Sequence, residues 1–546
     1  QRMKTLSDYM LEKEEELNLE FTSMVNRANT LIGNIGDLNR NIVIANGNNT
    51  SDQPSALLNE RDQAIDELAS IMGITVKEST TQNGAVTINL TSGESLVLEN
   101  GAFNLFELNT NADLTFKQLK LETNFGSQTK ADASIRIVED DLGGALGGLF
   151  GYRNDILGPA MRDVGQLSVA FADAMNTQNK LGMDLDGQLG SNIFDIPSFR
   201  GLAYSDTNGD YVVTAQITEG KGAELTDADY KIEVTAVTAG VPSQIEITLL
   251  NADGTPKKDA SGNDIIYSNY AVTAGFNELP GGIEVDFSGT DPYTVGNEFL
   301  IQPTKDIASK ITLETNRPED LAFASPVRAG ANNTNLGSAN VIDVAVSNTE
   351  VGASAFDGAG GLLNSAPAQI NFTAADTYDV VDGSGNVLAT VTGTTDLTNL
   401  ISQAGISPDP GFDLSLDGVP KAGDSFSISY NTDGFNDNSN ALNLAAIQNE
   451  NTVQVSSEAT NTPRTFQDAY ASMVGRIGED ASMAKVTLAS AEAMKVQSQN
   501  WFESVSGVSL DEEAANLIKY QQSYAAAARI LSTAQELFNT ILQSAR

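Results

Sequence analysis

Apolar side chains recur every seven residues at the C-terminal end of the chain, in the pattern of a coiled-coil helix. Two series three residues apart make up the pattern: Leu510, Leu517, Tyr524, Leu531 and Phe538, then Tyr520, Ala527, Ala534 and Ile541. This a/d spacing predicts one long helix over residues 507–546, with Ser509 as N-cap and Glu512 completing a capping box. An isolated helix is marginal in water, and each large side chain left exposed forgoes about 1.5–3 kcal/mol. The pattern therefore predicts a partner helix.

A second heptad series opens the chain and predicts a helix that runs to about Ala45. Its positions are Met3, Met10, Leu17, Met24, Leu31 and Leu38, flanked by Phe21, Ala28, Ile35 and Ile42. A shorter helix follows over residues 55–72 and ends at Gly73, where we expect a positive φ. The two helices should form an antiparallel pair whose stripes are intramolecular core.

From Ile74 to about Asp141 the apolar period changes to two, which is typical of strands. Asn83-Gly84, Ser92-Gly93 and Asn100-Gly101 are hairpin turns between them, so we predict a β-meander. Helical spacing returns over residues 142–182, with a kink at Gly158-Pro159. The glycines of residues 143–151 fit no phosphate-loop motif, and we interpret them as close backbone packing.

Two β-rich stretches follow, at residues 190–317 and 318–435, and a weak repeat relates them. GIEVDFSG and VGNEFLIQP, from Gly282, resemble GFDLSLDG and AGDSFSISY, from Gly411. A helix capped by Thr465 and Asp468 then runs to Trp501. Its predicted stripe is Phe466, Tyr470, Met473, Ile477, Ala484, Leu488 and Ala491.

The predicted fold class is α+β, a stem of long antiparallel helices with inserted antiparallel β-rich domains. Residues 1–72, 142–189 and 436–506 form the stem domain, and the meander of residues 73–141 packs on it. Residues 190–317 and 318–435 are a first and a second outer β-rich domain. Residues 507–546 form a separate C-terminal coiled-coil helix.

Four segments carry a resemblance to a known family. They are LDEEAANLIKYQQSYAAAARILSTAQELFNTIL from Leu510, LLNERDQAIDELASIMGI from Leu57, VGQLSVAFADAMNTQNKLG from Val164 and FQDAYASMVGRIG from Phe466. The first is similar to the C-terminal signature of flagellar axial proteins, and together they most resemble the first hook-associated protein family, which joins hook to filament. The resemblance covers the helical parts and says less about residues 190–440.

The resemblance implies a structural role, self-assembly and a set of partners. In the family, the C-terminal helix pairs with an N-terminal helix, and many subunits pack around the axis of a tube. The resemblance thus implies a ring or helical homo-oligomer that contacts the hook protein and a second junction protein. It also implies an export chaperone at the C-terminal helix, secretion through the flagellar type III export apparatus, and an extracellular location at the hook-filament junction.

On the same resemblance, we expect the residues of the predicted assembly seam to be Leu510, Leu517, Tyr520, Tyr524, Leu531, Phe538 and Ile541. The family's N-terminal arm is expected to be missing, since the chain opens at Gln1 inside a helical pattern. Without that arm, residues from about Val508 to Arg546 should be disordered in isolated subunits.

Composition narrows the range of chemistry. The 546 residues include no Cys and no His, and the formal net charge is −41. Disulfides, Cys nucleophiles, Ser-His-Asp triads and the usual zinc sites are therefore excluded, and we expect no enzyme, no cofactor and no specific metal site. The charge repels nucleic acid and anionic lipid, and no apolar run approaches the length of a membrane span, so neither is an expected partner.

Four short acidic loops carry part of a calcium-loop pattern, at Asp184–Gly187, Asp206–Gly209, Asn251–Gly254 and Asp382–Gly385. Each matches only the middle of an EF-hand loop, so we interpret them as turns. The alternative function is a secreted acidic adhesin or glycan-acting surface protein, because 72 acidic residues leave a catalytic carboxylate pair open. The C-terminal heptad helix favours the flagellar interpretation, since an adhesin or a hydrolase has no need of it.

Overall fold

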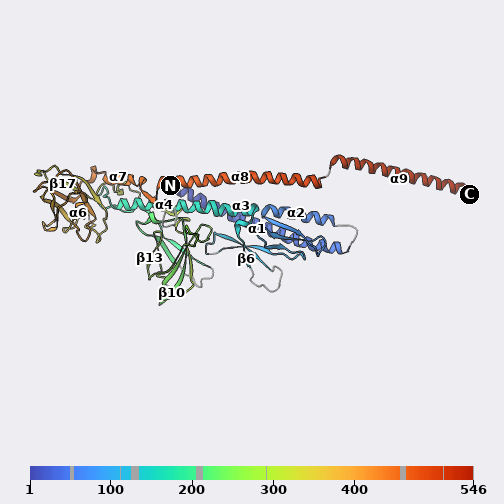
Figure 1. The fold of residues 1–546 in the computed structure, drawn as a ribbon, viewed down its shortest axis with the longest axis horizontal. Coiled ribbons are helices and arrows are strands. Elements are labelled where there is room, and N and C mark those ends of the chain that lie inside the picture. The colour runs from blue at the N-terminus through green and yellow to red at the C-terminus, as the bar shows by residue number, and fades with distance from the viewer. Residues whose placement is uncertain are drawn as a thin grey trace. The chain divides into compact units, whose positions relative to one another are not determined.

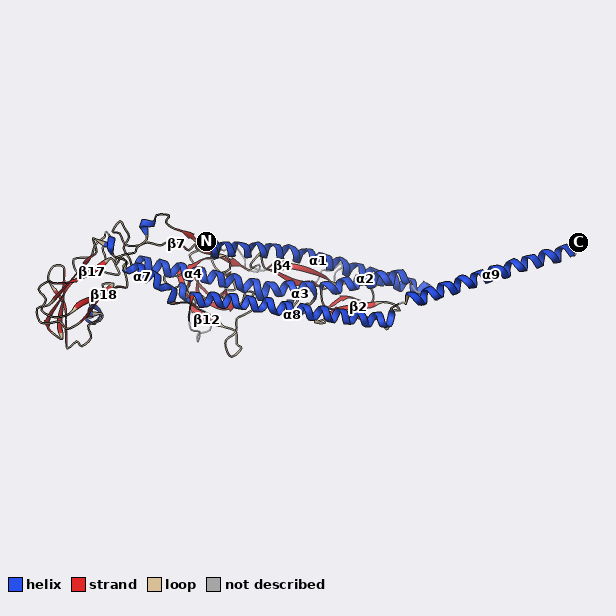
Figure 2. Ribbon diagram, turned by 90° about the horizontal axis from the view of Figure 1, so that it is seen from above, coloured by secondary structure: helices blue, strands red, loops and turns tan. Residues whose placement is uncertain are grey.

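The computed structural model describes residues 1–48, 54–110, 112–123, 134–204, 213–289, 292–358, 360–454, 463–507 and 509–544. The chain divides into two compact units, Gln1–Met473 and Val474–Arg546. Long helices and separate antiparallel sheets make up the fold (Figures 1 and 2), which confirms the predicted α+β class. Among the described helices, none combines the length and the apolar character that crossing a membrane requires.

Helix α1 (Arg2–Asn48) is the longest element of the first unit, and α2 (Ser55–Ile71) packs against it. The flanking positions of the predicted stripe are its most deeply buried: Phe21, Ala28, Ile35 and Ile42 have no exposed surface. The predicted positive φ at Gly73 is wrong. The chain is already extended at Met72, and the Gly73 amide donates to the carbonyl oxygen of Leu142 at 2.7 Å. Glycine there permits close approach of two backbones.

The predicted meander consists of two small sheets. Strands β1 (Ile74–Glu78), β2 (Val86–Leu90) and β3 (Ser95–Val97) form the first; β4 (Leu105–Thr110), β5 (Lys117–Glu122) and β6 (Ser134–Arg136) form the second. Gly84, Gly93 and Gly101 have positive φ, as the predicted hairpin turns require. The side-chain amide of buried Asn39, on α1, donates to the carbonyl oxygen of Val86 at 2.7 Å. This bond ties the first sheet to the helix.

A π-helical turn interrupts the helix that follows. Helix α3 (Gly144–Gly151) leads into the π segment η2 (Tyr152–Leu157) and then into α4 (Gly158–Lys180), preceded by the short 3-10 turn η1 (Glu139–Asp141). Pro159 has no amide hydrogen, so it cannot make the regular bond to the preceding turn. The predicted irregularity therefore takes the form of a wider helical turn just before Gly158. A Cβ at Gly144 would lie within 2.6 Å of the Ile71 carbonyl carbon, which agrees with the close-packing interpretation of these glycines.

The first outer β-rich region is one eight-stranded sheet with the order β12-β11-β10-β15-β8-β9-β14-β13. Its strands are β8 (Phe199–Ala203), β9 (Val213–Ile217), β10 (Asp229–Thr238), β11 (Val241–Leu250), β12 (Ile266–Ala271), β13 (Phe276–Leu279), β14 (Ile283–Asp286) and β15 (Glu298–Ile301). The short turn η3 (Gly222–Glu224) and helix α5 (Ile307–Lys310) flank it. Val169 of α4 belongs to the same core as the sheet's buried side chains, so this helix supports the sheet directly.

The second outer region has its own core, built on a five-stranded and a two-stranded sheet. The orders are β17-β23-β19-β20-β21 and β18-β22. The elements are η4 (Pro318–Asp320), β17 (Val327–Ala331), β18 (Asn340–Val346), β19 (Pro367–Ala374), β20 (Thr377–Asp382), β21 (Val387–Thr392), α6 (Leu400–Gln403), β22 (Phe412–Asp417) and β23 (Ser425–Tyr430).

The weak repeat corresponds to the same local turn in both regions. Gly296 precedes β15 and Gly423 precedes β23, each with a φ near 90°, and each is followed by a buried polar residue, Asn297 or Asp424. The strand before each turn is paired differently, because β14 lies between β9 and β13 whereas β22 pairs with β18. The likeness is therefore local.

Both β-rich regions leave and rejoin the helical part through antiparallel segments. Strand β7 (Phe194–Asp195) pairs with β16 (Thr312–Leu313), so the two ends of the first region lie side by side. The ends of the second region also meet, since the Asn431 amide donates to the Pro326 carbonyl oxygen at 2.8 Å. The predicted domain boundaries at residues 190, 318 and 435 stay a prediction.

The chain returns to helix through α7 (Ser439–Ala446), the turns η5 (Gly434–Asn436) and η6 (Ile447–Asn449), and the strand pair β24 (Asn451–Val453) and β25 (Arg464–Thr465). Helix α8 (Phe466–Ser506) follows, and α9 (Leu510–Ser544) is the last element.

Candidate assembly site

Helix α9 begins where its capping residues predict. The Glu512 amide donates to Oγ of Ser509 at 3.4 Å, and Asp511, Glu512 and Glu513 occupy the first turn. Negative charge at the N-terminal end of a helix is stabilised by the helix dipole. The capping residues in the sequence therefore correctly predict where this helix begins.

The side chains of the predicted seam are exposed to solvent along α9. Its seven side chains are exposed by fractions between 59% at Leu517 and 85% at Leu510, with Tyr520, Tyr524, Leu531, Phe538 and Ile541 in between. Exposed apolar residues scattered singly are ordinary, but a continuous row along one helix marks an interaction surface. That the row is an assembly seam stays a prediction.

Three further apolar side chains widen this row: Ile518, Ile530 and Leu537 are each more than half exposed. They are not part of the predicted heptad pattern, because they fall outside its a and d positions. Ile530 and Leu537 each directly precede an a position, so the C-terminal half of α9 has a broader apolar face than a two-stranded coiled coil needs. A face of this width fits contact with more than one helix.

Helix α8 starts with the predicted cap: Oγ1 of Thr465 donates to Asp468 at 2.8 Å, and the Asp468 amide donates back to that oxygen at 3.1 Å. The first part of the predicted stripe lies in the first unit, where Met473 is buried and Phe466 lies against Phe171 of α4 with ring centroids 5.6 Å apart. Leu488, in the later part of the stripe, is exposed, and so are Trp501 and Phe502 beyond the stripe. The predicted packing of α8 in the helical stem remains a prediction.

Three of the four acidic loops are turns whose carboxylate or amide groups bond to the protein itself. Asp382 accepts amide hydrogens from Ser384 and Asn386 at 2.9 and 2.8 Å, and the Asn386 side chain and these amides hold the pKa of Asp382 below its usual range. Asp184 accepts from the amides of Asp186 and Gln188 in the same way. Asn251–Gly254 closes as a hairpin turn with a positive φ at Gly254. The fourth loop, Asp206–Gly209, lies outside the described residues.

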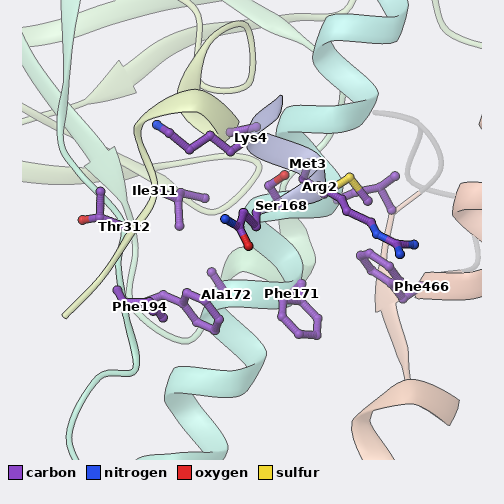
Figure 3. Close-up of a pocket in the computed structure, with 14 residues that line it drawn as sticks. Arg2, Met3, Lys4, Ser168, Phe171, Ala172, Phe194, Ile311, Thr312 and Phe466 are labelled. Carbon is purple, nitrogen blue, oxygen red and sulfur yellow. The ribbon is translucent and has the colours of Figure 1, made fainter. Parts of the chain in front are cut away.

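A largely apolar cavity of about 440 Å³ lies where α1, α4, β7 and the first turn of α8 meet (Figure 3). Phe171, Phe194 and Phe466 line it, and Met3 and Ile311 complete the wall. Ser168 is the one hydroxyl on α4 there, and it donates to the Val164 carbonyl oxygen. Arg2, Lys4 and Thr312 line it as well, but apolar side chains make up most of the wall, as at a packing surface.

Comparison with known proteins gives two family matches. Residues 1–194 match the flagellar hook-associated protein FlgK helical domain, and residues 501–544 match the flagellar basal body rod FlgEFG protein C-terminal region. Flagellar hook-associated protein 1 of Salmonella typhimurium is 27% identical over 545 residues, which is 99% of this chain and 74% of that protein. The Escherichia coli protein of the same name is 25% identical over 544 residues, with the same coverage.

A solved structure agrees over nearly the whole chain. The flagellar hook junction protein FlgK from Burkholderia pseudomallei superposes with a TM-score of 0.71 at 25% identity, covering 92% of this chain and 87% of that one. The chain is similar to flagellar hook-associated protein 1 over nearly its whole length. This similarity extends through residues 190–440, where the sequence resemblance alone said less.

Proposed function

We propose that this chain polymerises at the hook-filament junction through the apolar face of α9. The exposed row from Leu510 to Ile541 is the observation that carries the proposal. A 35-residue helix with such a face is stabilised by burial, at about 1.5–3 kcal/mol for each large side chain. This face gives a subunit what it needs to join its neighbours.

The chain is a structural component of the bacterial flagellum and a hook-filament junction protein, as its similarity to flagellar hook-associated protein 1 and to the solved hook junction protein indicates. The alternative of an acidic adhesin or glycan-acting protein has no support from these relatives. The finer statements are proposals: copies of this chain, the hook protein and a second junction protein are its partners, and an export chaperone covers α9 before assembly. Location outside the cell after type III export belongs to the same proposal.

We also propose that the chain is not an enzyme and holds no specific metal. Absence of His and Cys from the sequence supports this, as do the three acidic loops that close as ordinary turns. Calcium titration by calorimetry tests the metal part. Binding tighter than millimolar that Asp382→Ala or Asp184→Ala removes would contradict it.

The assembly proposal is tested by charge on the face of α9. Leu517→Asp combined with Leu531→Asp places two carboxylates in the seam, where burial of an unpaired charge is strongly unfavourable. The variant should fold with the parent's circular dichroism but leave cells without attached filaments. Gln522→Asp with Ser532→Asp is the matched control, since it adds the same charge at positions outside a and d and should leave filaments in place. Full-length filaments on cells that carry the seam variant would show that α9 is not the assembly element.

A further inference from the structure

Buried charges gather where α1, the loop between β4 and β5, α4 and the eight-stranded sheet pack together. The carboxylates are Glu14, Asp113, Glu139 and Asp229, and the cations are Arg153, Arg162 and Lys305; all seven residues are buried. Glu14 lies within electrostatic range of both Arg153 and Arg162. The seven groups therefore behave as one cluster.

Lys305 is the point where three separate parts of the chain meet. Its ammonium lies 2.8 Å from a carboxylate oxygen of Glu14 on α1 and 2.6 Å from one of Asp113 in the β4–β5 loop. It also donates to Oγ1 of Thr115 at 2.6 Å, and Thr115 in turn donates to Asp113 at 2.7 Å. Lys305 itself follows β15, so these bonds join the eight-stranded sheet to the first helix and to the meander.

Two more ion pairs surround that point. Arg162 on α4 donates to Asp229 of β10 at 2.6 Å, and the Gln302 amide donates to the same oxygen at 3.0 Å. Arg153 in the π segment pairs with Glu139 at 2.7 Å, and its guanidinium lies 3.9 Å from the centre of the Phe116 ring. Arg136 and Lys231 line a cavity of about 200 Å³ beside the cluster, together with Asp113 and Asp229. The two carboxylates paired with Lys305 come from α1 and the β4–β5 loop, and the ion pairs around them join α4 to β10 and η2 to η1.

Such a cluster is stable only while it is complete. A buried ion loses its hydration, and only its partners compensate for that loss, so removing one partner leaves the others uncompensated. Buried pairs are weak evidence for stability but they do select one arrangement of the parts that contribute them. Here those parts are the helices, the meander and the sheet.

We propose that this cluster is an acid-sensitive lock that holds the eight-stranded sheet in one orientation on α1 and the β4–β5 loop. The lock is closed while Asp113 is ionised beside Lys305. Protonation of Asp113 removes counter-charge from the buried ammonium of Lys305, and the sheet is released from α1. The rest of the sheet's own core does not depend on these groups.

The direction of the pH effect follows from Asp113. Burial acts to raise the pKa of Asp113, but the charge and hydrogen bond of Lys305, with two bonds from Thr115, hold it below the ordinary value of 3.8. A carboxyl whose pKa is lowered by folding stabilises the folded state above the unfolded pKa, and this stabilisation disappears as the pH falls through the folded pKa. The lock should therefore open only below about pH 3.8, the pKa of the unfolded reference.

Spin labels can measure the orientation directly, since the chain has no native Cys. Glu15→Cys on α1 with Gln244→Cys at an exposed position of β11, the joint pair, reports how the sheet lies on α1, and Glu15→Cys with Asp66→Cys on α2, the helix pair, reports the helices alone. For the full chain we expect a narrow distance distribution for both pairs at pH 7. As the pH is lowered step by step below 3.8, the joint pair should broaden while the helix pair stays narrow. Broadening of both pairs together would indicate unfolding of the whole unit and would overturn the proposal.

Two variants connect the effect to the cluster. Lys305→Met should broaden the joint pair at pH 7, whereas Lys310→Met, which removes an exposed lysine paired with Asp306, should leave it narrow. The triple variant Glu14→Gln, Asp113→Asn, Lys305→Met removes the titrating contacts together and serves if the single variant does not fold. Its joint distribution should change little between pH 7 and pH 3; the same acid broadening as in the parent chain would refute the lock.

Discussion

Single residues decide how the helices meet the rest of the chain, and Asn179 is the clearest case. This side chain on α4 is 1% exposed; its oxygen accepts from the Ala322 amide at 2.9 Å and its nitrogen donates to the Ser191 carbonyl oxygen at 2.7 Å. It thereby holds the segments through which the chain leaves for the first β-rich region and continues toward the second. The sequence gives no sign of this role, because the partners are 143 and 12 residues away.

Lys305 and Glu14 were equally out of reach of sequence analysis. Local patterns predict elements through neighbours three, four or seven positions apart, and no such pattern relates two charges from opposite ends of a domain. The predicted capping residues Thr465 and Ser509 are different, because their partners lie three residues on. Hydrogen bonds between residues close in the sequence could be predicted, whereas ion pairs between distant residues could not.

Gly165 supplies the first prediction at this scale. A Cβ at this position on α4 would overlap the carbonyl oxygen of Thr304, which is backbone and cannot rotate away. Gly165→Ala should therefore lower the free energy of unfolding by about 1–3 kcal/mol, the usual cost of overpacking. Gly148→Ala on α3 is the control, since nothing lies within 4 Å of its Cβ. Urea denaturation checks both, and an unchanged midpoint for Gly165→Ala would contradict the close approach.

Asp424 supplies the second prediction at the scale of single residues. Its buried carboxylate accepts amide hydrogens from Leu336 at 2.6 Å, Lys421 at 2.8 Å and Gly337 at 3.0 Å. Burial favours a raised pKa, but these three bonds hold the pKa below the ordinary 3.8, so the stabilisation exists above that pH and is lost as the pH falls below it.

Asp424→Asn should cost about 1–3 kcal/mol at pH 7, because the new amide hydrogens face the backbone donors. The difference from the parent should shrink as the pH falls below 3.8, which thermal unfolding at several pH values can measure. Asp343→Asn, at an exposed position, should change little at any pH. A difference that stays constant down to pH 2 would argue against an ionised Asp424.

At the scale of elements, periodicity predicted most of what the structure contains. Strands β1 to β6 fall within the predicted meander of residues 73–141 and β7 to β16 within the predicted β-rich stretch of residues 190–317, and α1, α8 and α9 begin or end within a few residues of the expected positions. The predictions that failed concern which strands pair with one another. One predicted meander is two sheets, and the strands of the first outer region join a single eight-stranded sheet in an order that no repeat or turn signal implied. Strand order is set by long-range contacts, which turn chemistry does not encode.

Helix α9 also gives a prediction about its own stability. With its apolar row exposed, it gains little from tertiary packing, and propensity alone leaves a helix marginal. In isolated subunits, amides of residues 510–544 should exchange within seconds, and trypsin should cleave after Lys519 and Arg529 before any site in α1. Assembled subunits should protect the same amides. Slow exchange throughout α9 in a monomeric sample would show that the helix needs no partner.

At the scale of the whole molecule, charge opposes assembly. Each subunit carries a formal net charge of −41, so neighbouring subunits repel one another at low ionic strength. Salt shortens the Debye length from about 30 Å at 0.01 M to about 8 Å at 0.15 M, which screens most of that repulsion while apolar burial is kept. The critical concentration for polymerisation should therefore fall as salt rises, as sedimentation can show. The Leu517→Asp, Leu531→Asp variant should gain nothing from salt, and a parent chain that dissociates on salt addition would point to ion pairs as the main force.

The paired ends of the β-rich regions bear on how this protein can change over generations. Because β7 pairs with β16, and the Asn431 amide donates to the Pro326 carbonyl oxygen, the chain leaves and re-enters the helical part at neighbouring points for each region. A change in the length of the exposed loops within either region therefore leaves the chain's path through the helices as it was. Such loops are thus free to vary between relatives, whereas the strands that share a core with Val169 or an ion pair with the helices have to change together with them.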